Sequence, residues 1–215
     1  MERVWATLIG YVFGNFLTAM VVGKIFLKIN PTEYGSHNPG TANMGAVFGK
    51  KWGILTCLGD LLKSLIALFI VYFAFPVHIN IAYAGLGLIL GHCFSIWDHF
   101  KGGKGVAVAA QVAVFYNWRI GFATLLVALV LTAIMQNLTI PPIMFMLLFS
   151  VYAFWHNQQA GIVFLVITLI MIFKFWHDII DFFTGHGKKV DILYSIKKKL
   201  ELRASNDKNF SKDID

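Results

Sequence analysis

Charge and cysteine are both scarce in this chain. Only 13% of its 215 residues are charged, whereas 58% are hydrophobic and the mean hydropathy is +0.69. So few charges cannot cover a water-facing surface, which excludes a soluble globular domain and indicates an integral membrane protein. The two cysteines, Cys57 and Cys93, both fall in apolar runs, so we expect neither a disulfide framework nor a metal site. No cofactor is expected either.

Long apolar runs make up most of the sequence. Seven of them predict an all-α, polytopic membrane protein with about seven transmembrane helices. The runs are Val4–Phe26, Gly53–Phe75, Ile79–Trp97, Val106–Trp118, Ile120–Met135, Pro141–Trp155 and Ala160–Trp176. The fourth run reaches roughly 20 Å at 1.5 Å per residue, less than a hydrocarbon core of about 30 Å. We therefore expect this run to be short, tilted or re-entrant and packed among the others.

The basic residues predict the orientation. If all seven runs cross, 15 of the 18 lysines and arginines lie on one side, with three connections and the C-terminus. Arg3 and Arg119 fall on the other side, and Lys63 lies within a run. The positive-inside rule makes the basic side cytoplasmic and places the N-terminus outside. Because this topology accounts for most of the net charge of +7, no nucleic-acid partner is expected.

The composition changes near residue 188. Residues 1–187 are expected to form a single transmembrane domain, and residues 188–215 a basic cytoplasmic tail. Within that tail, DILYSIKKKLELRAS has the pattern of a short amphipathic helix that would lie on anionic lipid headgroups. Membrane lipids are therefore expected partners.

The stretch Gly91–Val106, GHCFSIWDHFKGGKGV, is the best candidate for chemistry. Its anion-binding candidates are Lys101, Gly102, Gly103, Lys104 and Gly105. Glycines tolerate positive φ, so consecutive N–H groups can turn toward one anion, and the lysines add positive charge. The apolar segment that follows predicts a helix start, whose dipole favours the same anion. A phosphate site is the hypothesis; a plain turn with cytoplasmic lysines is the alternative.

The longest internal connection, from Asn30 to Gly53, is rich in glycine, serine, threonine and asparagine. These residues offer donors suited to a polyoxygenated ligand, although a flexible turn-rich loop has the same composition. Within the next run, Asp60 and Lys63 stand at i,i+3 spacing and are expected to pair and to support a site. His177 ends the last run on the same predicted face.

These residues resemble the bacterial acyl-phosphate:glycerol-3-phosphate acyltransferase family. GHCFSIWDHFKGGKGVA is similar to the family's second motif, which has a Gly-His followed by Phe-Lys-Gly-Gly-Lys-Gly-Val-Ala. The first motif, Ser-x-Asn-x-Gly-Ala-Thr-Asn, is matched by Ser36, Asn38, Gly40 and Asn43, with Thr41 and Ala42 in swapped order. Asp60 and Lys63 match the family's Asp-x-x-Lys.

The chain also departs from the family pattern. An arginine of the first motif is replaced by Ala46, and in the third motif Ile180, Phe183 and Lys189 replace an asparagine, an arginine and a glutamate. Arginine binds phosphate through two donors at once, and lysine does not substitute for it simply. The departures leave a divergent, weakly active or silent lipid- or phosphate-binding paralogue as an alternative. A transporter of a phosphorylated solute is a further alternative.

The resemblance implies transfer of a fatty acyl group from acyl-phosphate to the 1-hydroxyl of glycerol 3-phosphate, at the cytoplasmic face of a bacterial plasma membrane. An acyl phosphate is already activated, so no covalent enzyme intermediate is needed, which agrees with the absence of a Gly-x-Ser-x-Gly elbow. It also implies the site. Candidate catalytic residues are Lys104, His177 and Ser36; substrate-binding candidates are Asn38, Gly40, Asn43, His92, Lys101, Gly102, Gly103 and Gly105. Asp60 and Lys63 would support them.

Overall fold

The computed structural model describes residues 1–187, and every regular element in that range is a helix. This confirms the all-α prediction. The α-helices are α1 (Glu2–Gly14), α2 (Thr18–Val22), α3 (Thr41–Phe48), α4 (Lys50–Ala74), α5 (Ile79–Cys93), α6 (Val106–Tyr116), α7 (Trp118–Met135), α8 (Ile140–His156), α9 (Gln158–Lys174) and α10 (Trp176–Phe183). Short π and 3₁₀ turns are η1 (Gly23–Leu27), η2 (Pro31–Glu33) and η3 (Ile96–Asp98).

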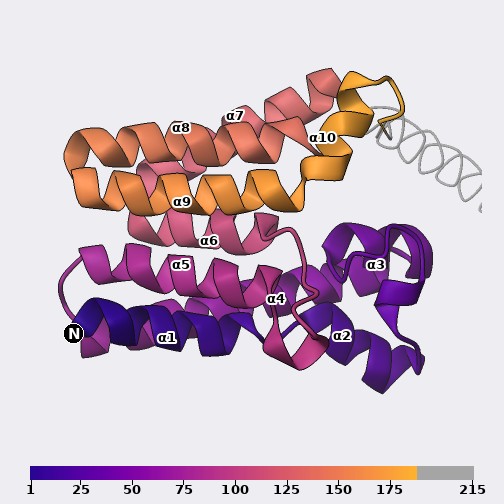
Figure 1. Cartoon of the computed structure of the whole chain (residues 1–215), viewed down its shortest axis with the longest axis horizontal. Helices are drawn as coiled ribbons and strands as arrows, with labels where there is room; N and C mark the ends of the chain where they lie inside the picture. The colour runs from indigo at the N-terminus through magenta and orange to yellow at the C-terminus, as the bar shows by residue number, and fades with distance from the viewer. Residues whose placement is uncertain (188–215) are drawn as a thin grey trace, which may run out of the picture.

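The long helices lie side by side, and each runs opposite to the one before it (Figure 1). Helices α1 and α5 approach most closely, because glycines remove side chains from their interface. A Cβ on Gly10 would lie 2.1 Å from the Ala84 carbonyl oxygen, and one on Gly87 would lie 2.0 Å from the Thr7 carbonyl oxygen. This contact fixes the C-terminal end of α5, where the candidate loop begins, against the end of α1.

The predicted spans differ in length. In the described part of the chain, four stretches are long and apolar enough to cross a membrane: Glu2–Leu27, Lys50–Ala74, Ile79–Asp98 and Trp118–Met135. Helices α9 and α10 would make a fifth as a pair that is bent by 64°, whereas α6 and α8 are shorter apolar helices. All seven predicted runs are thus helical, and the number that crosses stays a prediction.

Helix α6 packs against α4, α5 and α7, inside the bundle. Its 11 residues bury Val108, Ala109, Val112 and Ala113 in the main hydrophobic core. The packing agrees with the sequence-based expectation of a short helix packed among the others. A helix of this length can be stable there because its apolar residues contact protein on several sides.

The elements that carry most of the candidate site residues lie at one end of the bundle. Helices α2 and α3, the α5–α6 connection, the α7–α8 connection and α10 all lie at the right of Figure 1. The sequence-based grouping of these connections on one side is therefore confirmed. Which side faces the cytoplasm stays a prediction. The amphipathic segment expected in residues 188–215 lies outside the described residues.

Candidate active site

A buried polar cluster lies at this end of the bundle, and we call Asp60, Lys63 and His92 the buried floor. The predicted pair forms: the Lys63 Nζ lies 2.9 Å from the Asp60 Oδ1. The same ammonium lies 3.1 Å from the His92 Nδ1. All three residues are at most 5% exposed. Charges buried at this depth are stable only when paired and hydrogen-bonded, and each member of the floor meets that condition.

The floor also ties α1 to α4. The Lys63 ammonium donates to the carbonyl oxygens of Gly14 at 3.2 Å and Phe16 at 2.6 Å. These carbonyls lie where α1 ends, so they lack helical partners of their own. On the other side of the pair, the Thr18 hydroxyl donates to the Asp60 Oδ1 at 3.0 Å. Lys63 thus acts as a cap for α1 as well as a counter-ion for Asp60.

The α5–α6 connection, residues 94–105, packs directly on His92, and we call it the glycine loop. The Gly103 N–H donates to the His92 carbonyl oxygen at 3.0 Å. A Cβ on Gly103 would lie 2.2 Å from the His92 Nε2, and one on Gly102 would lie 2.1 Å from the His92 carbonyl oxygen. These two positions therefore need glycine for close approach to the floor.

This packing leaves the Gly103 N–H out of the predicted anion nest, and anion binding by the rest of the loop stays a prediction. Among Gly102, Gly103 and Gly105, only Gly105 has a positive φ, at 78°, where it caps the start of α6. The Gly103 N–H points to His92 and is already bonded. The imidazole of His92 lies beneath the loop, a position that supports a bracing role; direct contact with substrate stays a prediction.

The first half of the same loop is held by α1. The Asn15 Oδ1 accepts from the Ile96 N–H at 2.7 Å, and the Ser95 hydroxyl donates to the Asn15 carbonyl oxygen at 3.0 Å. The next turn places His99 and Phe100 at positive φ, 54° and 60°, which costs roughly 1–2 kcal/mol per residue. Sequence reasoning missed Asn15, although a lone amide in an apolar run was a usable signal.

Lys104 reaches across to α10. Its Nζ lies 2.6 Å from the Asp178 Oδ2 and 4.7 Å from the centre of the Phe175 ring. The 64° bend between α9 and α10 brings Asp178 over the loop. The sequence analysis did not single out Asp178; its only signal was a carboxylate within an aromatic stretch, one residue after His177. The ammonium of Lys104 thus pairs with a carboxylate of the chain, and its contact with a substrate phosphate stays a prediction.

A second lysine secures the end of α5. The Lys174 Nζ donates to the Cys93 carbonyl oxygen at 3.1 Å and lies 5.3 Å from the centre of the Phe94 ring. Helix ends carry unpaired carbonyls and a partial negative charge, both of which favour a lysine. Lys101, by contrast, is exposed on the loop. The loop is thus fixed from α1, α4, α5 and α9, while Lys101 faces outward and Lys104 lies partly buried against α10.

The loop before α3 carries most of the first motif, and we call it the first-motif loop. The side chain of Asn43 holds this loop together. The Asn43 Oδ1 accepts from the Ser36 N–H at 2.9 Å, and its Nδ2 donates to the carbonyl oxygens of Pro31 and Tyr34, each at 3.1 Å. Asn43 is buried, so the structure gives it a loop-ordering role, and ligand contact stays a prediction. Ser36 is exposed beside it, whereas Gly40 is buried at the start of α3.

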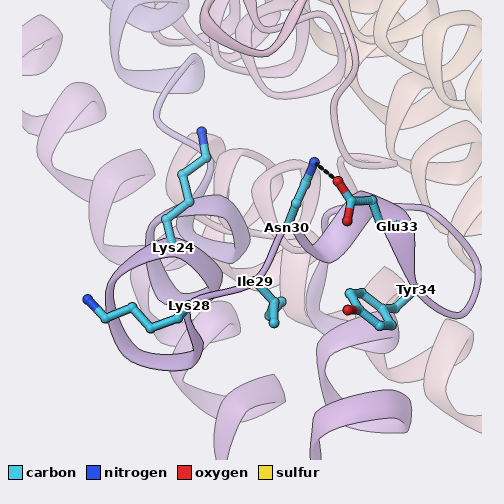
Figure 2. Close-up of a pocket in the computed structure, with 6 residues that line it drawn as sticks. All are labelled: Lys24, Lys28, Ile29, Asn30, Glu33 and Tyr34. Carbon is cyan, nitrogen blue, oxygen red and sulfur yellow. Dashed lines mark hydrogen bonds between the residues drawn. The ribbon is translucent and has the colours of Figure 1, made fainter.

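A groove lies beside this loop (Figure 2). It is open, measures about 470 Å³ and is lined by Lys24, Lys28, Ile29, Asn30, Glu33 and Tyr34. The Lys24 Nζ lies 3.6 Å from the Asp98 Oδ1, which links this region to the glycine loop. Within residues 1–187, no hydrogen bond or ion pair joins Ser36, Asn38 or Asn43 to Lys104 or His177. The ion pair between Lys24, in η1, and Asp98 thus connects the segment before the first-motif loop to the glycine loop.

Comparison with known proteins decides the family. The model of the family described as glycerol-3-phosphate acyltransferase matches residues 4–185. This chain belongs to the glycerol-3-phosphate acyltransferase family. It is 86% identical over 204 residues to glycerol-3-phosphate acyltransferase 1 of Lactobacillus acidophilus, covering 95% of this chain and 100% of that protein. It is 59% identical over 203 residues to glycerol-3-phosphate acyltransferase 1 of Lactobacillus johnsonii, covering 93% and 98%.

Solved structures agree on the fold of this acyltransferase. The crystal structure of PlsY (YgiH), an integral membrane glycerol 3-phosphate acyltransferase, in its glycerol 3-phosphate form superposes with a TM-score of 0.81. It is 24% identical in sequence, and the match covers 91% of this chain and 99% of that one. The lysophosphatidic acid form has a TM-score of 0.78 at 25% identity, over 88% of this chain and 95% of that one.

Three of the departures from the family motifs lie on the surface of this acyltransferase, whereas Thr139 and Pro142, which stand where the family has a serine-rich segment, are buried. Ala46 is exposed on α3, and Ile180 and Phe183 are exposed on α10. We call Ala46, Ile180 and Phe183 the exposed rim. Another departure, Lys189, lies outside the described residues. His177 is exposed beside Asp178, so the bend at the end of α9 brings it to the same end of the bundle as Lys104.

Proposed function

We propose that the chain moves a fatty acyl group from an acyl-phosphate to the 1-hydroxyl of glycerol 3-phosphate. The products are lysophosphatidic acid and inorganic phosphate, as in the first step of phospholipid synthesis. The observation that carries the proposal is the placement of the Lys104 ammonium, on a loop packed on a buried floor at one end of a membrane bundle. Membership of the acyltransferase family supports it independently.

The chemistry needs little from the protein beyond placement and charge. The 1-hydroxyl oxygen attacks the carbonyl carbon of the acyl phosphate, and the bond from that carbon to the bridging oxygen breaks. Phosphate leaves with the electron pair, and the hydroxyl proton passes to phosphate or water. A fixed ammonium stabilises the negative charge that grows on the leaving phosphate, and holding the two substrates together lowers the entropic cost.

Roles follow from position at the site. Lys104 would bind and stabilise a phosphate group. His177 and Ser36, both exposed at the same end of the bundle, would bind or polarise glycerol 3-phosphate with Asn38 and Lys101. Asp60, Lys63 and His92 would hold the loop in place from below.

The proposed location is a bacterial plasma membrane, with the Lys104 end facing the cytoplasm. The membrane assignment rests on the apolar helices and on the family. The orientation rests on the predicted topology, which assigns 15 of the 18 basic residues to the side of this end. A membrane setting also suits the donor, since the fatty chain of an acyl-phosphate can remain in lipid while its phosphate reaches Lys104.

The test is an assay of purified protein with labelled glycerol 3-phosphate and an acyl-phosphate. We expect the wild type to form lysophosphatidic acid and Lys104→Ala to lose at least about 100-fold in rate, as when one anion-stabilising donor is removed. No product from either protein, with glycerol 3-phosphate still bound, would replace the proposal with a silent binding paralogue. Counterflow of glycerol 3-phosphate into sealed vesicles, without product, would indicate a transporter.

A further inference from the structure

The cation assigned to phosphate already holds an anion of the chain itself. The Lys104 Nζ lies 2.6 Å from the Asp178 Oδ2, within direct ion-pair distance. The Phe175 ring lies on another side of the same ammonium, 4.7 Å away at its centre. Two of the directions from which an anion could approach Lys104 are therefore occupied by α10 and by the residue that precedes it.

We propose that Asp178 is a built-in competitor for phosphate at Lys104, and that it sets the affinity of the site for its phosphorylated substrates. The inference rests on the proposed function, because it takes Lys104 as the phosphate-binding cation. A phosphate that contacts Lys104 would lie against the Asp178 carboxylate, and two anions at that separation repel each other. The phosphate must therefore displace Asp178 from the ammonium.

Displacement requires only a side-chain movement. The Asp178 side chain is 38% exposed, so water can solvate its carboxylate once the carboxylate leaves the ammonium. Helix α10 retains a second attachment through Ile179, which packs against the main core. The competitor can thus leave without loss of the bend that places His177. Because the pair is partly solvated, the competition is modest in size.

Other lysines do not relieve the competition. The Lys174 ammonium is engaged by the Cys93 carbonyl oxygen at 3.1 Å. Lys101 is exposed on the loop, where water screens its charge. Lys104 is the cation in contact with both the loop and α10, so its free charge controls how strongly an anion is held there.

The test compares Asp178→Asn with Asp181→Asn, which removes the same charge from an exposed position on the same helix. Binding of a labelled acyl-phosphate, the substrate whose phosphate is assigned to Lys104, is measured at equilibrium without glycerol 3-phosphate, so that it does not depend on turnover. We expect the Kd to fall about two- to fivefold in Asp178→Asn and to stay unchanged in Asp181→Asn. Asp178→Glu, which keeps a competing carboxylate, should bind as the wild type does.

Two further measurements distinguish competition between Asp178 and phosphate from a purely structural role of Asp178. They are the steady-state kinetics of Asp178→Asn and the effect of the same substitution in Lys104→Ala. In the acyl-transfer assay, the KM for acyl-phosphate should fall in Asp178→Asn while kcat is unchanged. In a Lys104→Ala background, Asp178→Asn should change the Kd by less than about 1.5-fold, because no ion pair remains. An unchanged or raised Kd in Asp178→Asn, or an equal gain in Asp181→Asn, would overturn the inference. Absence of lysophosphatidic acid, with the Kd shift present, would overturn only the proposed function.

Discussion

The buried floor and the exposed rim lie at the same end of the bundle but differ in how they are held. Asp60, Lys63 and His92 are at most 5% exposed and contact one another within a network of named partners. Ile180 and Phe183 are 44% and 76% exposed. The floor keeps the residue types of the family motifs, whereas the rim carries the substitutions.

This difference has a physical cause. A change in the floor leaves a charge or a carbonyl group without its partner inside the bundle, which costs stability whatever the ligand. A change on the rim leaves the fold intact and alters only the affinity for a ligand. The divergence of this chain can therefore alter substrate affinity while the site's framework persists.

The largest effect is expected from Asp60→Ala, which leaves the Lys63 ammonium buried without its counter-ion. Loss of one partner of a buried pair costs about 3–5 kcal/mol of folding free energy. We expect a lower yield of folded protein and a lower thermal unfolding midpoint in detergent. The exposed control Asp181→Asn should change stability by less than about 0.5 kcal/mol. If the two variants unfold at the same temperature, the floor is not a stabilising element.

Next in size is Gly103→Ala, because the new Cβ would lie 2.2 Å from the His92 Nε2. Overpacking of this kind costs roughly 1–3 kcal/mol, and the loop that carries Lys104 should shift with it. Thermal unfolding and the acyl-transfer rate should both fall. Gly45→Ala is the matched control, since its nearest neighbour would be 3.7 Å away, an ordinary contact. Equal behaviour of the two variants would show that the loop does not rest on His92.

On the rim, Ala46→Arg restores the arginine of the family motif at an exposed position of α3. A new charge-assisted contact at a solvated site is worth about 1 kcal/mol, so the Kd for glycerol 3-phosphate should fall about fivefold. The unfolding midpoint should not move. Ala46→Gln adds length without charge and serves as the control. An unchanged Kd in Ala46→Arg would mean that this position does not face the substrate.

The smallest effect is expected from Ile180→Asn, which restores the family's asparagine on α10. A neutral hydrogen bond at an exposed position contributes about 0.5 kcal/mol, the low end of the usual range, so the KM for glycerol 3-phosphate should fall about twofold. Ile180→Ala controls for the loss of the exposed apolar side chain. A fall of the same size in both variants would assign the change to removal of isoleucine and not to a contact with substrate.

The fold was largely predictable because long apolar runs identify membrane helices in a sequence. The Asp60–Lys63 pair followed from i,i+3 spacing, and the grouping of the functional loops followed from alternation of the runs. The partners of Lys104 did not follow, because Asp178 is brought to it by a bend at the end of α9. The sequence allowed a positive φ at Gly102 and Gly103, but a sequence does not distinguish that use of glycine from close packing, which here depends on His92.

The central claim is acyl transfer from acyl-phosphate to glycerol 3-phosphate by attack at the carbonyl carbon, with the bridging oxygen leaving in the phosphate. It is tested by supplying purified protein with an acyl-phosphate that carries ¹⁸O in the oxygen that bridges carbon and phosphorus. Attack at the carbonyl carbon predicts equimolar lysophosphatidic acid and inorganic phosphate, with all of the label in the phosphate. Label in lysophosphatidic acid, or phosphate release without that product, would contradict the account.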